Sequence, residues 1–190
     1  MRTPTRLALT TLAVFSLAGC SDRPDKTGKD TSAADAQAGA TNGTLAAMLQ
    51  GEHRGLAAVL DNSGLRGALD GVGPYTLFAP ADAALKGAAG ADFTDPQMKA
   101  EGAALLRAHI VPGALTRADI IAAVDRSGGM GAQMRTMGGG LLTFTRSGQD
   151  LIATASDGAS ARMTGREVVA SNGVLQPLDG LLAKPIAAPN

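Results

Sequence analysis

The sequence predicts an α+β domain in which helices come first and a largely antiparallel sheet follows. Two observations predict this fold class. Apolar residues between positions 45 and 106 recur at the three- and four-residue spacing of buried helix faces. From position 141 onward, short apolar runs are separated by glycine-containing turn pairs, which is typical of hairpins. Helices and strands therefore do not alternate as they do in a parallel βαβ sheet.

The composition supports one packed domain and excludes several kinds of site. Of 190 residues, 45% are hydrophobic and 18% are charged, which is enough apolar surface for a core. Lys and Arg total 17 against 17 Asp and Glu, so no nucleic-acid partner is expected. Two His and one Cys leave no set for a zinc cage or a disulfide framework. No cofactor is expected, and the 3% aromatic content argues against a stacking surface for sugars or bases.

The N-terminus has the pattern of an export signal. Arg2 and Arg6 precede an uncharged apolar run over 7–17, which is shorter than the ~20 residues of a membrane-spanning helix. The run ends in Leu-Ala-Gly-Cys, which resembles the lipobox of bacterial lipoproteins and implies lipidation of Cys20. We therefore expect a lipoprotein signal peptide over 1–19 and stable attachment to a membrane of a bacterial envelope. Ser21 after the cysteine resembles the sorting signal for the outer membrane, whereas a periplasmic or an outward-facing position stays open.

Residues 20–43 are expected to form a lipidated tether. The stretch after Cys20 has no large apolar side chain and cannot bury enough surface to order itself. A flexible chain of this length has an r.m.s. span of roughly 26 Å. The folded domain is expected over 44–184, with a short tail over 185–190.

The first half of the domain is predicted to be mainly helical. One buried face is expected along 45–60, a break at 61–64, and a further short helix around Leu65 and Leu69. The face comprises Leu45, Met48, Leu49, Leu56, Val59 and Leu60. A strand over 75–78 follows, and Pro80 suits the first turn of the next helix.

Two local signals predict further helix starts. Asp95 followed by Pro96 indicates a cap before a helix whose Leu105 and Leu106 face the core. Thr116 with an acidic residue three positions later, Asp119, resembles a capping box. The helix that it opens carries Ile120, Ile121 and Val124.

The second half is predicted to form strands joined by tight turns. Strands are expected over 141–146, 151–155, 161–163 and 168–169, and another is expected from Val174. Ser147-Gly148, Asp157-Gly158 and Asn172-Gly173 supply turns between them.

Three stretches, taken in order, resemble the fasciclin domain family. They are YTLFAPADAAL at 75–85, LLRAHIVPG at 105–113 and ASNGVLQPLDGLLAKP at 170–185. The resemblance implies a β-wedge of two largely antiparallel sheets flanked by helices. It also implies a non-catalytic role in binding or adhesion. The partner would be an envelope protein or a polysaccharide.

The sequence departs from the family pattern at two places. Many members have a Tyr-His pair where this chain has Ala108-His109, so recognition of integrin-type receptors through that pair is not expected. Gln176 stands where a His is usual, and Pro177 follows it. Because proline lacks an N–H donor, the last strand is expected at a sheet edge or with a bulge.

The resemblance also assigns candidate site residues. It implies a contact surface made of Phe78, Ala79, Pro80, Asp82, Leu85, His109 and Ile110, and structural roles for Asn172, Gly173 and Asp179. We expect His109 to be hydrogen-bonded between a helix end and a strand; the alternative is a general base. Asp82 and Asp179 are expected to accept hydrogen bonds from backbone amides, although they could form a carboxylate pair. His53 is expected in solvent between two helices.

Two other functions stay open. An envelope hydrolase would need an activated nucleophile with a positioned His, and the chain has no G-x-S-x-G motif. Met130, Met134 and Met137 could bind Cu(I) through soft thioethers, or could simply fill space in a packed loop. No other metal site is expected.

Overall fold

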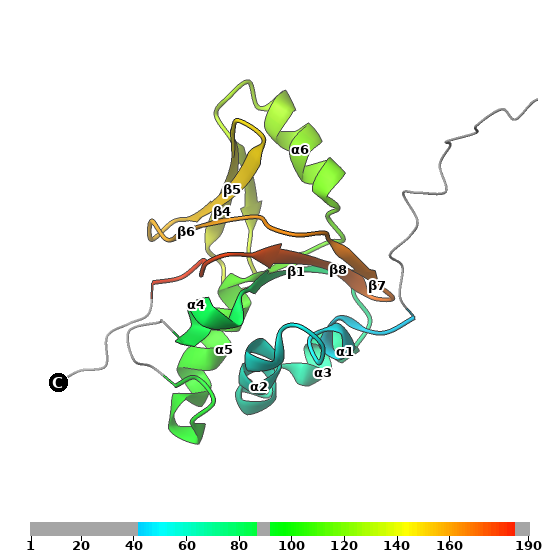
Figure 1. The fold of residues 1–190 in the computed structure, drawn as a ribbon, viewed down its shortest axis with the longest axis vertical. Coiled ribbons are helices and arrows are strands. Elements are labelled where there is room, and N and C mark those ends of the chain that lie inside the picture. Colours follow the sequence, from blue (N-terminus) through cyan, green and yellow to red (C-terminus); the bar gives the residue numbers. More distant parts are fainter. Residues whose placement is uncertain (1–41, 87–91, 185–190) are drawn as a thin grey trace, which may run out of the picture. The chain divides into compact units, whose positions relative to one another are not determined.

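The computed structural model describes residues 42–86 and 92–184 (Figure 1). The predicted signal peptide, Cys20, nearly all of the predicted tether and the tail at 185–190 lie outside the described residues. Within the described ranges, no helix has the length and hydropathy needed to cross a membrane.

The first sheet joins the three stretches that resemble the fasciclin family, because β1, β2 and β8 each come from one of them. Its order is β2 (Ile110–Pro112), β1 (Tyr75–Pro80), β8 (Gly173–Leu178) and β7 (Val168–Ala170). Strands β1 and β8 run parallel, whereas β2 and β7 pair antiparallel with their neighbours. The hairpin predicted at Asn172-Gly173 is confirmed as the connection from β7 to β8.

The second sheet is a meander of four antiparallel strands. Its order follows the chain: β3 (Ala132–Arg135), β4 (Leu141–Ser147), β5 (Asp150–Ala155) and β6 (Ser160–Arg162). Two contacts connect the sheets. The N–H of Met137, which follows β3, donates to the carbonyl of Ile110 in β2, and Met163, which follows β6, forms a β-bridge with Leu178 in β8. The predicted α+β class with two largely antiparallel sheets is confirmed.

The helices lie on two sides of these sheets (Figure 1). The set below β1 and β8 in Figure 1 is α1 (Leu45–Met48), α2 (Arg54–Ser63), α3 (Arg66–Asp70), α4 (Asp82–Lys86) and α5 (Lys99–Ala108), with a 3₁₀ turn, η1 (Pro96–Met98), before α5. Helix α6 (Arg117–Arg126) contacts β3 and β4 of the second sheet.

Strand β1 separates two apolar cores through its two-residue side-chain period. Leu77 and Ala79 pack with α1, α2 and α5, whereas Phe78 faces the second sheet. The ring of Phe78 lies 5.2 Å from the ring of Phe144 on β4, measured between centroids. One strand therefore supplies both cores, which fixes the helices and the second sheet relative to each other.

The predicted helix caps are confirmed. The Asp95 side chain accepts from the Gln97 N–H, with Pro96 in the first turn. Thr116 and Asp119 form the reciprocal capping box at the start of α6. Leu105 and Leu106 are buried, as the apolar spacing predicts.

Four details differ from the prediction. The helical region at 45–60 is two helices, because 49–53 turns between α1 and α2. Pro80 ends β1 instead of opening a helix. Strand β3 was not predicted.

Pro177 is the fourth difference, because β8 is an inner strand. The first residue of β7, Val168, pairs with Leu175, so Pro177 lies beyond the start of β7. Its carbonyl accepts from the Thr164 N–H on that side. The missing proline N–H therefore costs no ladder bond, although the strand is central.

Candidate functional site

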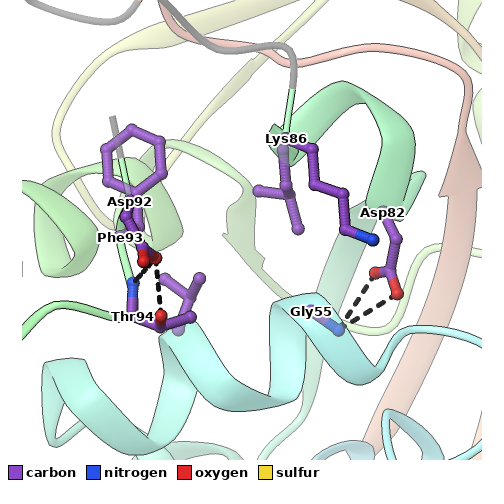
Figure 2. A pocket seen from close by; sticks show the side chains of 8 residues that line it. Gly55, Asp82, Lys86, Asp92, Phe93 and Thr94 are labelled. Atoms are coloured by element: carbon purple, nitrogen blue, oxygen red, sulfur yellow. Dashed lines mark hydrogen bonds between the residues drawn. The ribbon is translucent and has the colours of Figure 1, made fainter. Parts of the chain in front are cut away.

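A cavity of about 410 Å³ opens between α2, α4 and the turn at 92–94 (Figure 2). Its size lies within the usual range of ligand pockets. We call it the α2–α4 cavity. It is lined by Gly55, Val59, Asp82, Leu85, Lys86, Asp92, Phe93 and Thr94.

The α2–α4 cavity combines an apolar floor with charged walls. Val59, Leu85 and Phe93 are each at least nine-tenths buried. Asp82 and Lys86 come from α4, and the ammonium group of Lys86 turns toward the Asp82 carboxylate (Figure 2). Such a lining suits a ligand that has both an apolar part and polar groups.

Asp82 fixes one wall by closing the start of α2. Both carboxylate oxygens accept from the backbone N–H of Gly55, each at 3.1 Å. A carboxylate at this place satisfies a donor that the helix leaves unpaired and also favours the positive end of the helix dipole. This contact is the one that the sequence predicts for Asp82.

Asp92 is held by its own turn on the opposite wall (Figure 2). It accepts from the hydroxyl of Thr94 and from the Thr94 N–H, the latter at 2.9 Å. The side-chain bond, followed by the backbone bond, lowers the pKa of Asp92 below its ordinary value. This wall therefore carries a negative charge at neutral pH.

His109 lies elsewhere, buried between the end of α5 and the chain after β8. Its Nε2 accepts from the Leu182 N–H at 2.9 Å, so the proton is on Nδ1, which donates to the Leu105 carbonyl at 2.8 Å. Burial lowers the pKa of His109 to about 4, and the bond to Leu105 opposes this shift only in part. Because both ring nitrogens are engaged, the geometry is the structural one expected and leaves neither nitrogen free for proton transfer.

The contact surface implied by the resemblance is corrected by burial. Six of its seven residues are buried: Phe78, Ala79, Pro80, Leu85, His109 and Ile110. Apart from Leu85, which lines the α2–α4 cavity, these side chains cannot form a contact surface on the outside of the folded domain. Asp82 is half-buried, and together with the cavity-facing Leu85 it places part of the expected surface in the α2–α4 cavity.

Asn172, Gly173 and Asp179, the residues with predicted structural roles, all lie against backbone groups of neighbouring segments. The Asn172 carbonyl oxygen of the side chain accepts from the Leu45 N–H, and its amide donates to the carbonyls of Leu69 and Gly71. Glycine is required at position 173 because the backbone of β1 passes close to it. An added Cβ would lie 2.0 Å from the backbone carbonyl oxygen of Tyr75.

Asp179 is the third of these residues. It accepts from the Arg162 N–H at 2.7 Å and pairs with its guanidinium at 3.3 Å. Asp82 accepts from Gly55 at the start of α2, whereas Asp179 contacts Arg162 at the end of β6. The two side chains therefore have different partners and do not form a carboxylate pair.

The methionines and His53 have different surroundings from one another. Met134 packs against the core of the second sheet, whereas Met130 is 86% exposed and Met137 is partly exposed. Across the described residues, no cluster of three His, Cys, Asp or Glu could hold a metal ion. His53 is half-buried instead of fully in solvent, because its Nδ1 contacts the Pro80 carbonyl at 3.3 Å.

Sequence reasoning missed most residues of the α2–α4 cavity. Lys86, Asp92, Phe93 and Thr94 had no assigned role, although Asp-x-Thr is a local signal for a turn closed by the Asp side chain. It also missed the role of Gln176, which is fully buried and donates to the Leu115 carbonyl and to Glu167.

Comparisons with known proteins give the family and the fold. The family model of the Fasciclin domain matches residues 51–184. The fold is similar to a solved FAS1 domain pair from the insect cell adhesion molecule fasciclin I, with 18% identity and a TM-score of 0.57. That match covers 72% of this chain and 46% of the insect structure, so the chain spans about half of it. No curated protein matches the chain.

Proposed function

The chain belongs to the fasciclin domain family, and from this premise we propose a non-catalytic interaction module, attached by lipid on Cys20 to a membrane of a bacterial envelope. Fasciclin domains are associated with cell adhesion and are generally non-catalytic. The partner is an envelope protein or a polysaccharide. The outer membrane is the proposed location.

The α2–α4 cavity is the observation that carries the binding role. Its apolar floor of Val59, Leu85 and Phe93 offers surface that a ligand can cover, and the charges of Asp82, Lys86 and Asp92 select polar groups around it. Hydrogen bonds hold Asp82 and Asp92 in place before any ligand arrives, which reduces the ordering cost of binding.

Photo-crosslinking in living cells tests this site. A photoreactive residue at Ala83, exposed on α4, is compared with one at Gln133, exposed on β3. We expect a reproducible product from position 83 that disappears when Lys86→Glu and Phe93→Ala are introduced, and no such product from position 133. Equal capture at both positions, or capture that survives the cavity substitutions, contradicts the proposal.

A separate experiment tests the anchor. Metabolic labelling with an alkyne fatty acid should label the natural chain and not the Cys20→Ser variant, which should leave the membrane fraction. Labelling that persists in Cys20→Ser would contradict the proposal that the lipid is attached at Cys20.

A further inference from the structure

A second cavity, of about 260 Å³, lies between α6, the tip of the β4–β5 hairpin and the chain that follows β6. We call it the α6 cavity. Its floor is apolar, with Ile121, Leu151 and Met163, and its walls carry two arginines, Arg117 and Arg146. Its volume is below the 300–1,000 Å³ of pockets for drug-sized ligands, so it admits one small group of a larger molecule.

Arg117 is held rigidly in the wall of the α6 cavity. Its Nε donates to the Gln176 side chain at 3.1 Å, and its two terminal nitrogens donate to the carbonyls of Thr164 at 3.2 Å and Gly165 at 3.5 Å. Gln176 is itself fixed, because its amide donates to the Leu115 carbonyl at 3.1 Å and to Glu167 at 2.7 Å. The guanidinium is therefore oriented before any ligand binds, and these bonds engage three of its five N–H groups.

The charge of Arg117 is not matched by a direct ion pair within residues 42–86 and 92–184. The side chain is half-buried, and burial lowers the pKa of Arg117, an effect that the charge of Glu167 opposes only in part. Partial burial of an unpaired cation is unfavourable, and an anion placed against it relieves that cost.

Arg146 supplies a second cation to the lining of the α6 cavity. It is 41% exposed and pairs with Asp125 at 3.2 Å, a surface contact that stabilises the domain little. Asp150 also lines the cavity and disfavours an anion, but its carboxylate lies 3.6 Å from Arg162, which offsets its charge.

We propose that the α6 cavity binds a compact anionic group, a carboxylate or a phosphate, held between Arg117 and Arg146 with Gln149 beside it. Arginine recognises both groups through paired N–H donors. The carboxylate would come from a sugar acid and the phosphate from a phosphate ester. This site is separate from the α2–α4 cavity, so its failure leaves the proposed function unaffected.

The test is a titration of the full chain with sodium glucuronate and, separately, with sodium phosphate, at ionic strength held constant with sodium chloride. Binding is followed by calorimetry and by the amide NMR signals of Gln149 and Gly165. We expect saturable binding of at least one anion; glucuronate alone indicates a sugar acid, and phosphate alone a phosphate ester. No saturation by either anion up to about 10 mM overturns the proposal.

Matched variants decide whether the arginines are responsible. Arg146→Gln should weaken binding about tenfold, which is the loss of one charge-assisted contact. Arg135→Gln, an exposed arginine on β3 that donates to the Gly139 carbonyl, should leave it unchanged. Arg117→Lys retains the charge in case Arg117→Gln fails to fold, and should weaken binding by losing the paired donors. Equal weakening by Arg146→Gln and Arg135→Gln overturns the proposal, because it would reflect general charge alone.

Discussion

The Nε2 atom of His109 accepts a hydrogen bond from the backbone N–H of Leu182 at 2.9 Å. The bond requires a neutral imidazole, because a protonated ring would present a second donor to the same N–H. His109 thus joins the end of α5 to the chain after β8 only in its neutral form.

The free energy of unfolding should therefore fall on acidification. The pKa of His109 is lowered to about 4 in the folded domain, against an ordinary value of 6.5. Between these values the unfolded chain binds the proton and the folded domain does not, so stability is full above pH 6.5 and declines as the pH falls toward about 4. The loss should total about 3 kcal/mol, measured by urea unfolding across this range.

The two histidines provide a direct control for this pH dependence. In His109→Gln the decline between the two pKa values should largely disappear, whereas His53→Gln should retain it. A decline of equal size in the His109→Gln variant would show that carboxylates cause it.

Removal of the Asp82 carboxylate should destabilise α2. Asp82→Ala leaves the Gly55 N–H without its acceptor and should cost about 1 kcal/mol in urea unfolding. Asp125→Ala removes an exposed carboxylate that pairs with Arg146 and should cost about 0.5 kcal/mol or less. Equal losses in the two variants would mean that the bond to Gly55 contributes nothing special.

Asn172→Ala should be among the most damaging polar substitutions. It removes three side-chain hydrogen bonds, to Leu45, Leu69 and Gly71, and leaves partly buried backbone groups unpaired. We expect a loss of about 3 kcal/mol in the free energy of unfolding. The neighbouring Ser171→Ala removes one exposed bond to Gly43 and should cost below about 1 kcal/mol.

Two glycine substitutions should have opposite signs. Gly173→Ala places a Cβ 2.0 Å from the backbone carbonyl oxygen of Tyr75, so β8 must move away from β1 and the domain should unfold at a much lower temperature. Gly67→Ala lies inside α3, meets nothing within 4 Å, and should raise stability by up to about 1 kcal/mol. Thermal unfolding of both variants checks this, and an equal effect would contradict the close-approach argument.

Local signals predicted local structure well. The caps at Asp95 and Thr116, and the hairpin at Asn172-Gly173, depend on a few adjacent residues and were confirmed. Pro177 shows the limit of such reasoning. Its place on an inner strand is tolerated because β7 begins only at Val168, opposite Leu175, which no residue near Pro177 encodes.

The candidate site was less predictable for a related reason. The resemblance of the YTLFAP stretch to the fasciclin family implied a contact surface, but Phe78, Ala79 and Pro80 are buried because β1 supplies both cores. The α2–α4 cavity arises where α2, α4 and the turn at 92–94 meet, so its lining is distant in sequence. Of the residues that line this cavity, only Asp82 and Leu85 were predicted from the sequence as candidate site residues.

The parallel pairing of β1 with β8 also sets an order for folding. Residues that pair directly, such as Tyr75 and Gly173, are separated by about a hundred positions, and such non-local contacts form slowly. Synthesis proceeds from the N-terminus, so β1 can pair with β8 only after nearly the whole domain has been synthesised. A chain that ends before residue 173 should therefore leave the edge of β1 that pairs with β8 without its partner, and this open strand edge should make the chain depend on chaperones.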